Sequence, residues 1–315
     1  MKILLTGGTG FIGRWTLKEL IGRGHAVEIF DDLSNSSLDN IAEFRGNPAL
    51  VKVHVGDIKD AGLLKKVFAE GAFDSVLHLA ASIIVQESID NPKKVFDNDV
   101  IGSFNVIEEA RKHGCSFLFM STCMVYSRAG MDSKISEKHP VFPASPYAAC
   151  KLAGENLTIS YHQAYGMKTL VVRPFNTYGP YQKSNMEGGV VPIFVKLAMD
   201  GKPLKIYGDG TQTRDLLYVE DCSRFLALAL EKCHAGQLNG TIMNAGTGTD
   251  ISVNDLAKMV SGGRSEIVHV PHIHPQAEIP KLLCDSAMAE RILGWKPEVS
   301  LAEGVEIMRK HFSDR

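Results

Sequence analysis

The sequence lacks a long apolar run and an excess of charge of either sign. No stretch approaches the roughly 20 apolar residues that a membrane-spanning helix needs, and Met1–Leu5 leads directly into a glycine-rich turn rather than a signal peptide. With 34 Lys and Arg against 36 Asp and Glu, the net charge of −2 gives no reason to expect nucleic acid or a membrane as partner. We therefore expect a cytoplasmic protein.

Paired cysteines are also missing. The six cysteines are scattered and none forms a C-x-x-C pair, so we expect reduced thiols rather than a disulfide framework, and no bound metal. Low-complexity tracts and short internal repeats are absent as well. What remains is an ordinary globular composition, 44% hydrophobic and 22% charged, over 315 residues. That length suffices for one large domain or two smaller ones.

A glycine-rich turn follows the first predicted strand. Lys2–Thr6 is a short apolar run typical of a buried strand, and Gly7, Gly10 and Gly13 follow it before an amphipathic helical segment. Glycines permit a tight strand-to-helix turn and a close approach of the backbone to a pyrophosphate at the helix N-terminus. The strand–turn–helix context favours a dinucleotide site over a plain glycine-rich turn.

Acidic residues follow the second and third predicted strands, over residues 27–30 and 51–55. Asp31 lies about 20 residues beyond the glycines, where a carboxylate bonds the adenosine ribose hydroxyls and repels a 2′-phosphate. No arginine adjoins Asp31 or Asp32, which favours NAD over NADP, although Asp32 also fits a plain loop acid. Asp57 either reaches the adenine amino group or caps the next helix.

Strand and helix patterns alternate along the first half of the chain. A fourth strand over 76–81 ends in small residues, and His78 within it is more typical of a packed histidine than of a ligand. The alternation predicts an α/β fold with a Rossmann-type, doubly wound parallel sheet. Further strands are predicted over 116–120, 168–172 and 241–244, and helices over 61–69, 95–113, 190–199 and 253–260.

A tyrosine and a lysine four residues apart open a predicted helix over residues 145–163. Ser145 suits the N-cap and Pro146 the first helical position. Tyr147 and Lys151 share one helix face. An ammonium beside a phenol stabilises the phenolate, so the pair makes a plausible base near neutral pH. Chance spacing is the alternative when the helix is considered alone.

Together these motifs resemble the extended short-chain dehydrogenase/reductase family, specifically its NAD-dependent nucleotide-sugar epimerases and dehydratases. The resemblance covers almost the full length of the chain. It is carried by Gly7/Gly10/Gly13, Asp31, Asp57, Leu79-Ala80-Ala81, Thr122, Tyr147-x-x-x-Lys151, Arg173 to Pro180, Gly208 to Asp215, Asn244-Ala245-Gly246 and Leu293-Gly294-Trp295-x-Pro297.

The resemblance implies a Rossmann domain interleaved with a smaller C-terminal α/β substrate domain. Residues 1–173 plus about 213–245 would bind NAD, and about 174–212 plus 246–315 would bind the nucleotide sugar. It also implies a homodimer in which the helices over 95–113 and 145–163 pair across a two-fold axis.

Roles for individual residues also follow from the resemblance. Thr122 would hold the sugar hydroxyl, Tyr147 would transfer its proton, and Lys151 would bind the nicotinamide ribose and lower the pKa of the tyrosine. By position alone, Thr122 fits an ordinary strand-end hydroxyl bonded to backbone. The residues implied to contact NAD are Gly7, Gly10, Phe11, Ile12, Gly13, Asp31, Asp32, Asp57, Ile58, Leu79, Ala80, Ala81, Tyr147, Lys151 and Pro174. Those implied to contact the nucleotide sugar are Thr122, Cys123, Met124, Asn176, Val190, Arg214 and His274.

Two of these positions match residues that bind the diphosphate of the nucleotide sugar. Arg214 suits that role, with Asn176, because a planar guanidinium pairs with phosphate oxygens in two places. A salt bridge from Arg214 to Asp215 or to another acid is the alternative. His274 stands where relatives often carry a further diphosphate-binding arginine. The polar, glycine-rich residues 181–189 predict a mobile loop over the sugar.

The residues after Thr122 separate the reactions that the resemblance implies. Relatives remove the proton of a sugar hydroxyl, usually at C4, while hydride moves to NAD. The 4,6-dehydratases then typically use an Asp and a Glu where this chain has Cys123 and Met124. This favours a 4-epimerase of a UDP-hexose or UDP-N-acetylhexosamine. A 4,6- or 5,6-dehydratase using the Cys123 thiol is the alternative, and a non-catalytic NAD-binding regulator a remote one. Asp99 also departs from the family, which usually has Asn there.

Overall fold

The computed structural model describes residues 1–130, 133–185, 189–271 and 279–314, and it divides the chain into two compact units. The first consists of Met1–Val125, Ser145–Arg173 and Ser223–Met243. The second consists of Tyr126–Ala144, Pro174–Cys222 and Asn244–Arg315. Residues 126–144 and about 213–222 thus group with the second unit, whereas the sequence analysis placed them in the first. Segments of the two units alternate along the chain.

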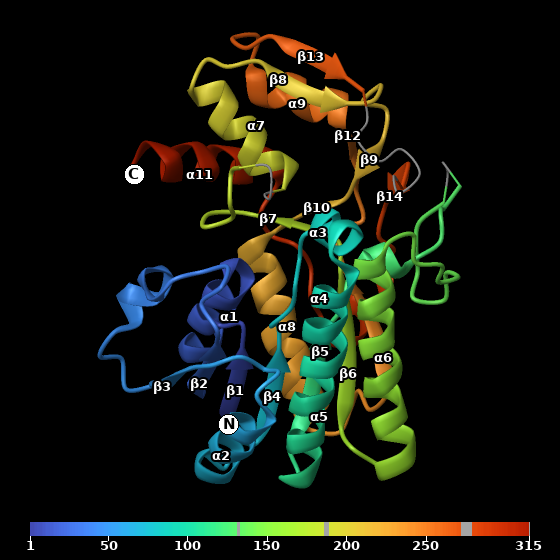
Figure 1. The fold of residues 1–315 in the computed structure, drawn as a ribbon. Coiled ribbons are helices and arrows are strands. Elements are labelled where there is room, and N and C mark those ends of the chain that lie inside the picture. Colours follow the sequence, from blue (N-terminus) through green and yellow to red (C-terminus); the bar gives the residue numbers. More distant parts are fainter. Residues whose placement is uncertain (131–132, 186–188, 272–278, 315) are drawn as a thin grey trace. The chain divides into compact units, whose positions relative to one another are not determined.

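A seven-stranded sheet lies at the centre of the first unit (Figure 1). Its order is β11-β6-β5-β4-β1-β2-β3, and the strands from β3 through β6 pair in parallel. The strands are β1 (Lys2–Thr6), β2 (Ala26–Asp31), β3 (Leu50–Val55), β4 (Ser75–His78), β5 (Ser116–Met120), β6 (Thr169–Pro174) and β11 (Thr241–Ala245). The order 3-2-1-4-5-6 is that of a Rossmann fold, which confirms the predicted class and places the strand ends that bind ligands at one edge.

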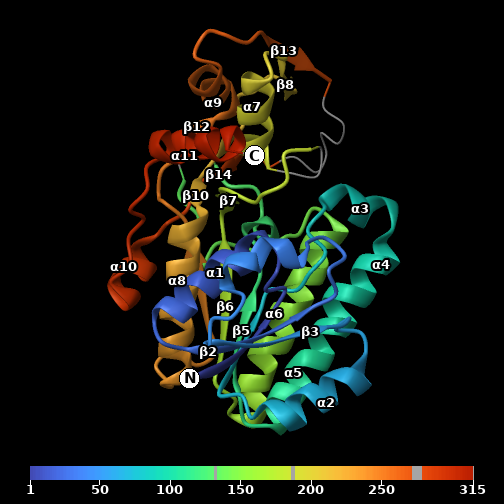
Figure 2. The same cartoon turned by 90° about the vertical axis from the view of Figure 1, so that its left-hand side faces the viewer.

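Helices cover both faces of this sheet. Figure 2 shows α1 and α8 on one side and α2 and α5 on the other. The hydroxyls of Thr16 on α1 and Ser223 on α8 lie 3.3 Å apart, and Glu231 of α8 accepts hydrogen bonds from Arg23 and His25 at the end of α1. The bounds are α1 (Phe11–Gly22), α2 (Ala61–Gly71), α5 (Ser103–Lys112), α6 (Pro146–Tyr165) and α8 (Val219–His234).

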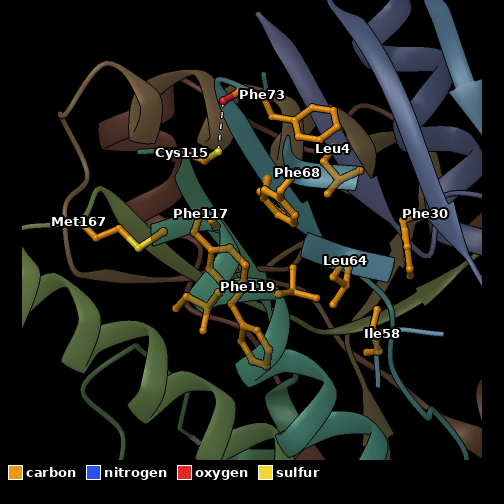
Figure 3. Close-up of a cluster of buried hydrophobic side chains, with 14 of the residues drawn as sticks. Leu4, Phe30, Ile58, Leu64, Phe68, Phe73, Cys115, Phe117, Phe119 and Met167 are labelled. Atoms are coloured by element: carbon orange, nitrogen blue, oxygen red, sulfur yellow. Dashed lines mark hydrogen bonds between the residues drawn. The ribbon is translucent and has the colours of Figure 1, made fainter. Parts of the chain in front are cut away.

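A cluster of aromatic and aliphatic side chains fills the space between the sheet and helices α2, α5 and α6 (Figure 3). Phe68 and Phe73 pack edge to face with their ring centroids 5.7 Å apart. Gly154 lets α6 approach β5, because a Cβ atom there would lie 2.3 Å from the Phe119 ring. Since Phe119 is fully buried, its truncation to alanine is of the kind that costs about 3–5 kcal/mol.

The predicted helix over 95–113 is not a single regular helix. It consists of α4 (Pro92–Phe96), a π-helical turn η2 (Asp97–Gly102) and α5. Gly102 allows this turn to pass close to Ile58, because a Cβ atom would lie 2.6 Å from that side chain. A short helix that the sequence analysis did not predict, α3 (Val85–Asp90), precedes it. Hydrophobic periodicity alone does not register the extra residue that a π turn inserts.

The second unit combines short strands with α7, which has its predicted bounds. In it β7 pairs with β10, β8 with β13, and β9 with both β12 and β14. Trp295 is buried and donates to the Asp221 carbonyl at 3.1 Å. The elements are α7 (Val190–Met199), α9 (Val253–Ser261), α10 (Ala287–Leu293), α11 (Leu301–Ser313), β7 (Asn176–Tyr178), β8 (Leu204–Tyr207), β9 (Thr213–Arg214), β10 (Leu216–Tyr218), β12 (Ile251–Ser252), β13 (Ile267–Val270) and β14 (Lys281–Leu282).

The cysteines are free thiols, as predicted, and all six are buried. Within the described ranges, no three His, Cys, Asp or Glu side chains gather in a way that could hold a metal ion. None of the helices in those ranges has both the length and the apolar character needed to cross a membrane.

Candidate active site

The glycine-rich turn joins β1 to α1 at the carboxyl edge of the sheet. Gly7 has a positive φ of 70°, and a Cβ atom on it would lie 2.8 Å from the Ala80 nitrogen. At Gly13 a Cβ atom would lie 2.1 Å from the Gly7 carbonyl oxygen. Gly10 is the N-cap of α1 and supplies no side-chain cap, so the first N–H groups of the helix, beginning at Phe11, keep their capacity to bind an anion.

The carboxylate of Asp31 connects this turn to the end of β2. It is buried and accepts hydrogen bonds from the backbone of Thr9 at 3.0 Å and of Leu33 at 2.9 Å, and from the Ser36 hydroxyl at 3.3 Å. Asp32, by contrast, bonds the backbone and hydroxyl of Ser34 in a local turn. Of the two predicted acids, Asp31 is therefore the one fixed against the glycine-rich turn.

Asp57 does not cap α2, so that alternative is wrong. The cap is Asp60, whose carboxylate accepts a hydrogen bond from the Leu63 backbone at 2.9 Å. Asp57 instead accepts from the Lys59 backbone at 2.8 Å and pairs with the Lys59 ammonium at 2.7 Å. The helix begins at Ala61, too far along the chain for Asp57 to reach its first turn. Contact of Asp57 with adenine stays a prediction.

His78 is a packed histidine, as predicted. Its Nδ1 lies 2.7 Å from the Thr6 hydroxyl and its Nε2 lies 2.9 Å from the Ser103 hydroxyl. Burial, followed by the charge of Lys151, lowers the pKa of His78 to about 3. The ring is therefore neutral and connects β1, β4 and α5 under the site.

The first unit brings together the predicted triad at the end of β5 and the start of α6. Ser145 caps α6 by accepting a hydrogen bond from the Ala148 backbone, so the helix begins as predicted. Two residues further, the Tyr147 phenol lies close enough to Thr122 for that side chain to lower its pKa. Lys151 is buried below Tyr147 and donates to the Met120 carbonyl at 2.9 Å.

Thr122 also satisfies its alternative interpretation, because its hydroxyl accepts a hydrogen bond from the Met124 backbone at 3.2 Å. The threonine therefore both closes the turn after β5 and faces Tyr147. That turn, η3 (Cys123–Val125), places the buried Cys123 thiol close enough to raise the pKa of the tyrosine. The side chain of Met124 is half-buried.

Together, the protein's own groups raise the pKa of Tyr147. Burial raises it, and the nearby Asp99 and Cys123 raise it further, while only the hydrogen bond with Thr122 opposes them. Burial also lowers the pKa of Lys151, whose ammonium is engaged with a carbonyl oxygen. Within the chain alone, Lys151 therefore does not lower the pKa of Tyr147 as expected. Lowering this pKa needs a further positive charge near the ring.

Two acids of the first unit were not assigned a role from sequence. Glu155 continues the face of α6 that carries Tyr147 and Lys151, and it forms a bidentate pair with Arg173 at 2.8 and 2.5 Å. Asp99, in the π-helical turn, is almost completely buried and electrostatically coupled to Lys151. The i, i+4, i+8 spacing could have identified Glu155, whereas nothing in the sequence reveals the π turn that orients Asp99.

The predicted diphosphate-binding residues belong to the second unit. Asn176 is exposed at the start of β7, and Val190 begins α7. The guanidinium of Arg214 donates to the carbonyls of Thr213 and Ile279 at 2.8 and 2.9 Å.

The carboxylate of Asp215 accepts hydrogen bonds from the backbone N–H groups of Thr247, Gly248 and Cys284 and from the Thr247 hydroxyl. Pro174 ends β6, and His274 and part of the loop 181–189 lie outside the described residues.

Comparison with known proteins agrees with this arrangement. The sequence model of the family described as GDP-mannose 4,6 dehydratase matches residues 4–308. UDP-glucose 4-epimerase of Mycolicibacterium smegmatis is 35% identical over 97% of this chain and 96% of that protein. The chain belongs to the NAD-dependent nucleotide-sugar epimerase/dehydratase family of extended short-chain dehydrogenases/reductases. It is an enzyme of that family, and the family uses NAD.

Solved structures superpose over nearly the whole chain. Pal from Bacillus thuringiensis is 52% identical with a TM-score of 0.97, covering 100% of this chain and 99% of that one. The UDP-glucose 4-epimerase of Thermus thermophilus, in complex with NAD, is 31% identical with a TM-score of 0.90, covering 99% of both chains. Relatives of this chain thus include both epimerases and dehydratases.

Proposed function

We propose that this enzyme inverts C4 of a nucleotide-diphosphate sugar through a transient 4-keto sugar, with a UDP-hexose or UDP-N-acetylhexosamine as substrate. The observation that carries the proposal is the buried grouping of Thr122, Tyr147 and Lys151 next to a turn that holds Cys123 and Met124 in place of two carboxylic acids. The first unit would bind NAD and the second the nucleotide sugar.

The residues at the carboxyl edge fit a dinucleotide. The close approach of Gly7 to the backbone of Ala80 leaves no room for a side chain between them, and the start of α1 offers uncapped N–H groups to a pyrophosphate. Asp31 is held where it can accept hydrogen bonds from ribose hydroxyls. A bound NAD would supply the acceptor and donor of the C4 hydride, and these residues would hold its pyrophosphate and ribose.

Each member of the triad has a separate task. Thr122 would hold the C4 hydroxyl through its own hydroxyl, and Tyr147 would remove the proton in the oxidative half and restore it in the reductive half. The Lys151 ammonium, together with a further positive charge near the ring, would stabilise the tyrosinate. Asn176 and Arg214 would bind the diphosphate, and rotation of the keto sugar between the half-reactions would present its opposite face.

Elimination of water would need more groups than this turn supplies. A 4,6-dehydratase must remove the C5 proton and assist the departing C6 hydroxyl. The thioether of Met124 can do neither, which supports epimerisation. Cys123 supports a second candidate, a 4,6- or 5,6-dehydratase, because its thiol is buried within electrostatic reach of the Tyr147 phenol and could transfer one proton.

A deuterium experiment separates the two candidates. The enzyme is incubated with UDP-, GDP-, CDP- and dTDP-sugars in deuterated water, and the products are analysed by NMR and mass spectrometry. We expect a C4 epimer of unchanged mass without solvent deuterium, because the hydride returns to its own carbon. A product lighter by one water, or deuterium at C5, would instead establish the dehydratase.

The variant Cys123→Ala completes this experiment. An epimerase should keep most of its turnover, since the thiol has no proton to move, whereas a dehydratase that uses the thiol should lose about 10²-fold or more. Alanine is chosen because its methyl group retains part of the buried volume of the thiol but cannot transfer a proton.

We also propose NAD rather than NADP as the cofactor, and Asp31 as its selector. Protein stripped of dinucleotide should bind NAD more tightly than NADP in a calorimetric titration. Asp31→Asn keeps an acceptor for the Thr9 backbone but removes the negative charge. The ratio of NAD affinity to NADP affinity should therefore fall by at least about tenfold, which corresponds to a loss of about 1.4 kcal/mol of repulsion between the carboxylate and the 2′-phosphate. Asp32→Asn, on the adjacent local turn, is the control and should have little effect. Tighter NADP binding by the unaltered protein would contradict the proposal.

A homodimer through the helices at 92–112 and α6 is the assembly we propose. Phe96, Ile101 and Phe104 support it, since these large apolar side chains are more than two-fifths exposed along the first of these segments. Their burial against a second copy would remove them from water.

A further inference from the structure

A buried arginine ends the first turn of α1, directly after the last glycine of the motif. Arg14 is only 1% exposed. Its Nε donates to the Asn40 carbonyl at 2.8 Å, and its Nη2 pairs with the Glu43 carboxylate at 2.7 Å. The guanidinium also lies over the Trp15 ring, 4.6 Å from the ring centroid. Because a charge is costly to bury unless it is paired and hydrogen-bonded, this arrangement requires an explanation.

The two hydrogen-bond partners of this guanidinium belong to one short segment between β2 and β3. That segment is η1 (Leu38–Phe44), a 3₁₀-helical stretch with a kink at Ile41. Long 3₁₀ stretches are weak on their own, so η1 depends on contacts with its surroundings. Ile41 and Phe44 are buried, but hydrophobic contacts are non-directional. The planar fork of Arg14 therefore supplies the directional contact to η1.

Two further contacts join this part of the chain to the glycine-rich turn. The Asn40 amide donates to the Thr9 carbonyl at 2.9 Å. The Ser36 hydroxyl lies 2.5 Å from the Thr9 hydroxyl and 3.3 Å from Asp31 Oδ1. The Thr9 backbone in turn donates to Asp31 Oδ2 at 3.0 Å. A continuous chain of hydrogen bonds therefore leads from Arg14 through η1 to the carboxylate of Asp31.

The contacts of Asp31 leave one position for a ligand. A carboxylate offers about four lone-pair positions. Oδ1 accepts from the Leu33 backbone and the Ser36 hydroxyl, whereas Oδ2 accepts only from the Thr9 backbone among the residues that the structure describes. The remaining position on Oδ2 suits one ribose hydroxyl. Its direction is set by Thr9 and Ser36, and Thr9 is held by Asn40 of η1.

We propose that Arg14 is a positioning residue of the cofactor site: it holds η1 against the glycine-rich turn and so fixes the Asp31 carboxylate toward the adenosine ribose. Arg14 itself would touch neither ribose nor pyrophosphate, because its guanidinium is buried and bonded to η1. The proposal rests on the proposed function for Asp31 as the ribose acceptor. It adds that the selection of NAD depends on a residue outside the binding contacts.

Loss of the guanidinium should weaken both the affinity for NAD and the preference for it. In Arg14→Met, η1 is no longer oriented, so the Asp31 carboxylate loses its fixed direction. Protein stripped of dinucleotide should bind NAD about tenfold more weakly, the scale of one hydrogen bond to a charged group. NADP affinity should fall less, because a mobile carboxylate repels the 2′-phosphate less. A residue that only supports the fold would leave the ratio of the two affinities unchanged.

Calorimetric titration with NAD and NADP is combined with hydrogen exchange of the dinucleotide-free protein. The amides of residues 33–44 should exchange at least about tenfold faster in Arg14→Met. Arg45→Met, one residue beyond η1, is the matched control, because Arg45 pairs with Asp39 on the surface at 3.5 Å, and it should change neither measurement. Unchanged NAD affinity in Arg14→Met, or an unchanged ratio of NAD to NADP affinity, would overturn the proposal.

Asn40→Ala tests the same chain of hydrogen bonds if Arg14→Met does not fold. The half-buried Asn40 keeps its carbonyl for Arg14 in this variant and loses only its bond to Thr9. NAD affinity and the ratio of NAD to NADP affinity should again fall, and unchanged values would show that η1 does not orient Asp31. Neither measurement involves turnover, so a wrong assignment of the reaction would leave both results standing.

Discussion

Tyr147→Phe is expected to lower the turnover number by at least about 10²-fold, the usual contribution of a general acid–base residue. The phenyl ring fills the same buried volume, so α6 and its cap at Ser145 stay intact. What is lost is the hydroxyl that lies near Thr122 and that we propose exchanges the sugar proton. Single-turnover kinetics with the substrate identified by the deuterium experiment measures the loss.

Two controls show whether the loss of turnover comes from the missing hydroxyl. The affinity for NAD, measured by calorimetry, should change little, because the proposed cofactor contacts at Gly7, Asp31 and Lys151 remain. Tyr161→Phe, on the same helix but remote from Thr122 and bonded to Glu108 at 3.1 Å, should keep its turnover. If Tyr147→Phe turns over at nearly the unaltered rate, another group transfers the proton, and Cys123 is the first candidate.

The sequence predicts those elements of the fold that short-range patterns determine. The alternation of apolar runs and amphipathic segments located β1 and β5 with their observed bounds, and the Ser145-Pro146 cap signal located the start of α6. Both signals are local, because a buried parallel strand is continuously apolar and a helix N-terminus needs a capping oxygen. The short pairs β9–β12 and β8–β13 depend on partners distant in sequence, and no comparable signal marked them.

The candidate site was predicted where chemistry is tied to spacing. Tyr147 and Lys151 are one turn apart on any helix, and a hydroxyl after β5 meets them once the sheet is parallel. The pKa values were not predictable in this way, because they depend on burial and on side chains from other elements. The pKa of Tyr147 is raised where the sequence suggested lowering, since burial and the charge of Asp99 act on it together.

Glu155→Gln is expected to destabilise the first unit by about 3–5 kcal/mol, the usual cost of breaking a buried ion pair. The side chains of Glu155 and Arg173 are 1% and 3% exposed, and Glu155 also accepts a hydrogen bond from the Ser121 hydroxyl. Breaking the pair removes the negative charge that faces the buried guanidinium between β6 and α6. For a unit of this size, the melting temperature should fall by roughly 10 °C, as measured by calorimetry at several scan rates.

A double variant separates the charge from the packing. Glu155→Met combined with Arg173→Met removes both charges while keeping side chains of moderate volume, so it should recover most of the stability that Glu155→Gln loses. Asp97→Asn, which breaks only the surface pair with Lys93, should leave the melting temperature unchanged.

If Glu155→Gln has the same melting temperature as the unaltered protein, the ion pair contributes no net stability. Water or a neighbouring group then compensates the charge of Arg173. If instead the double variant is as unstable as Glu155→Gln, the loss comes from the Ser121 hydrogen bond and the packing of α6 on β6, not from the broken ion pair.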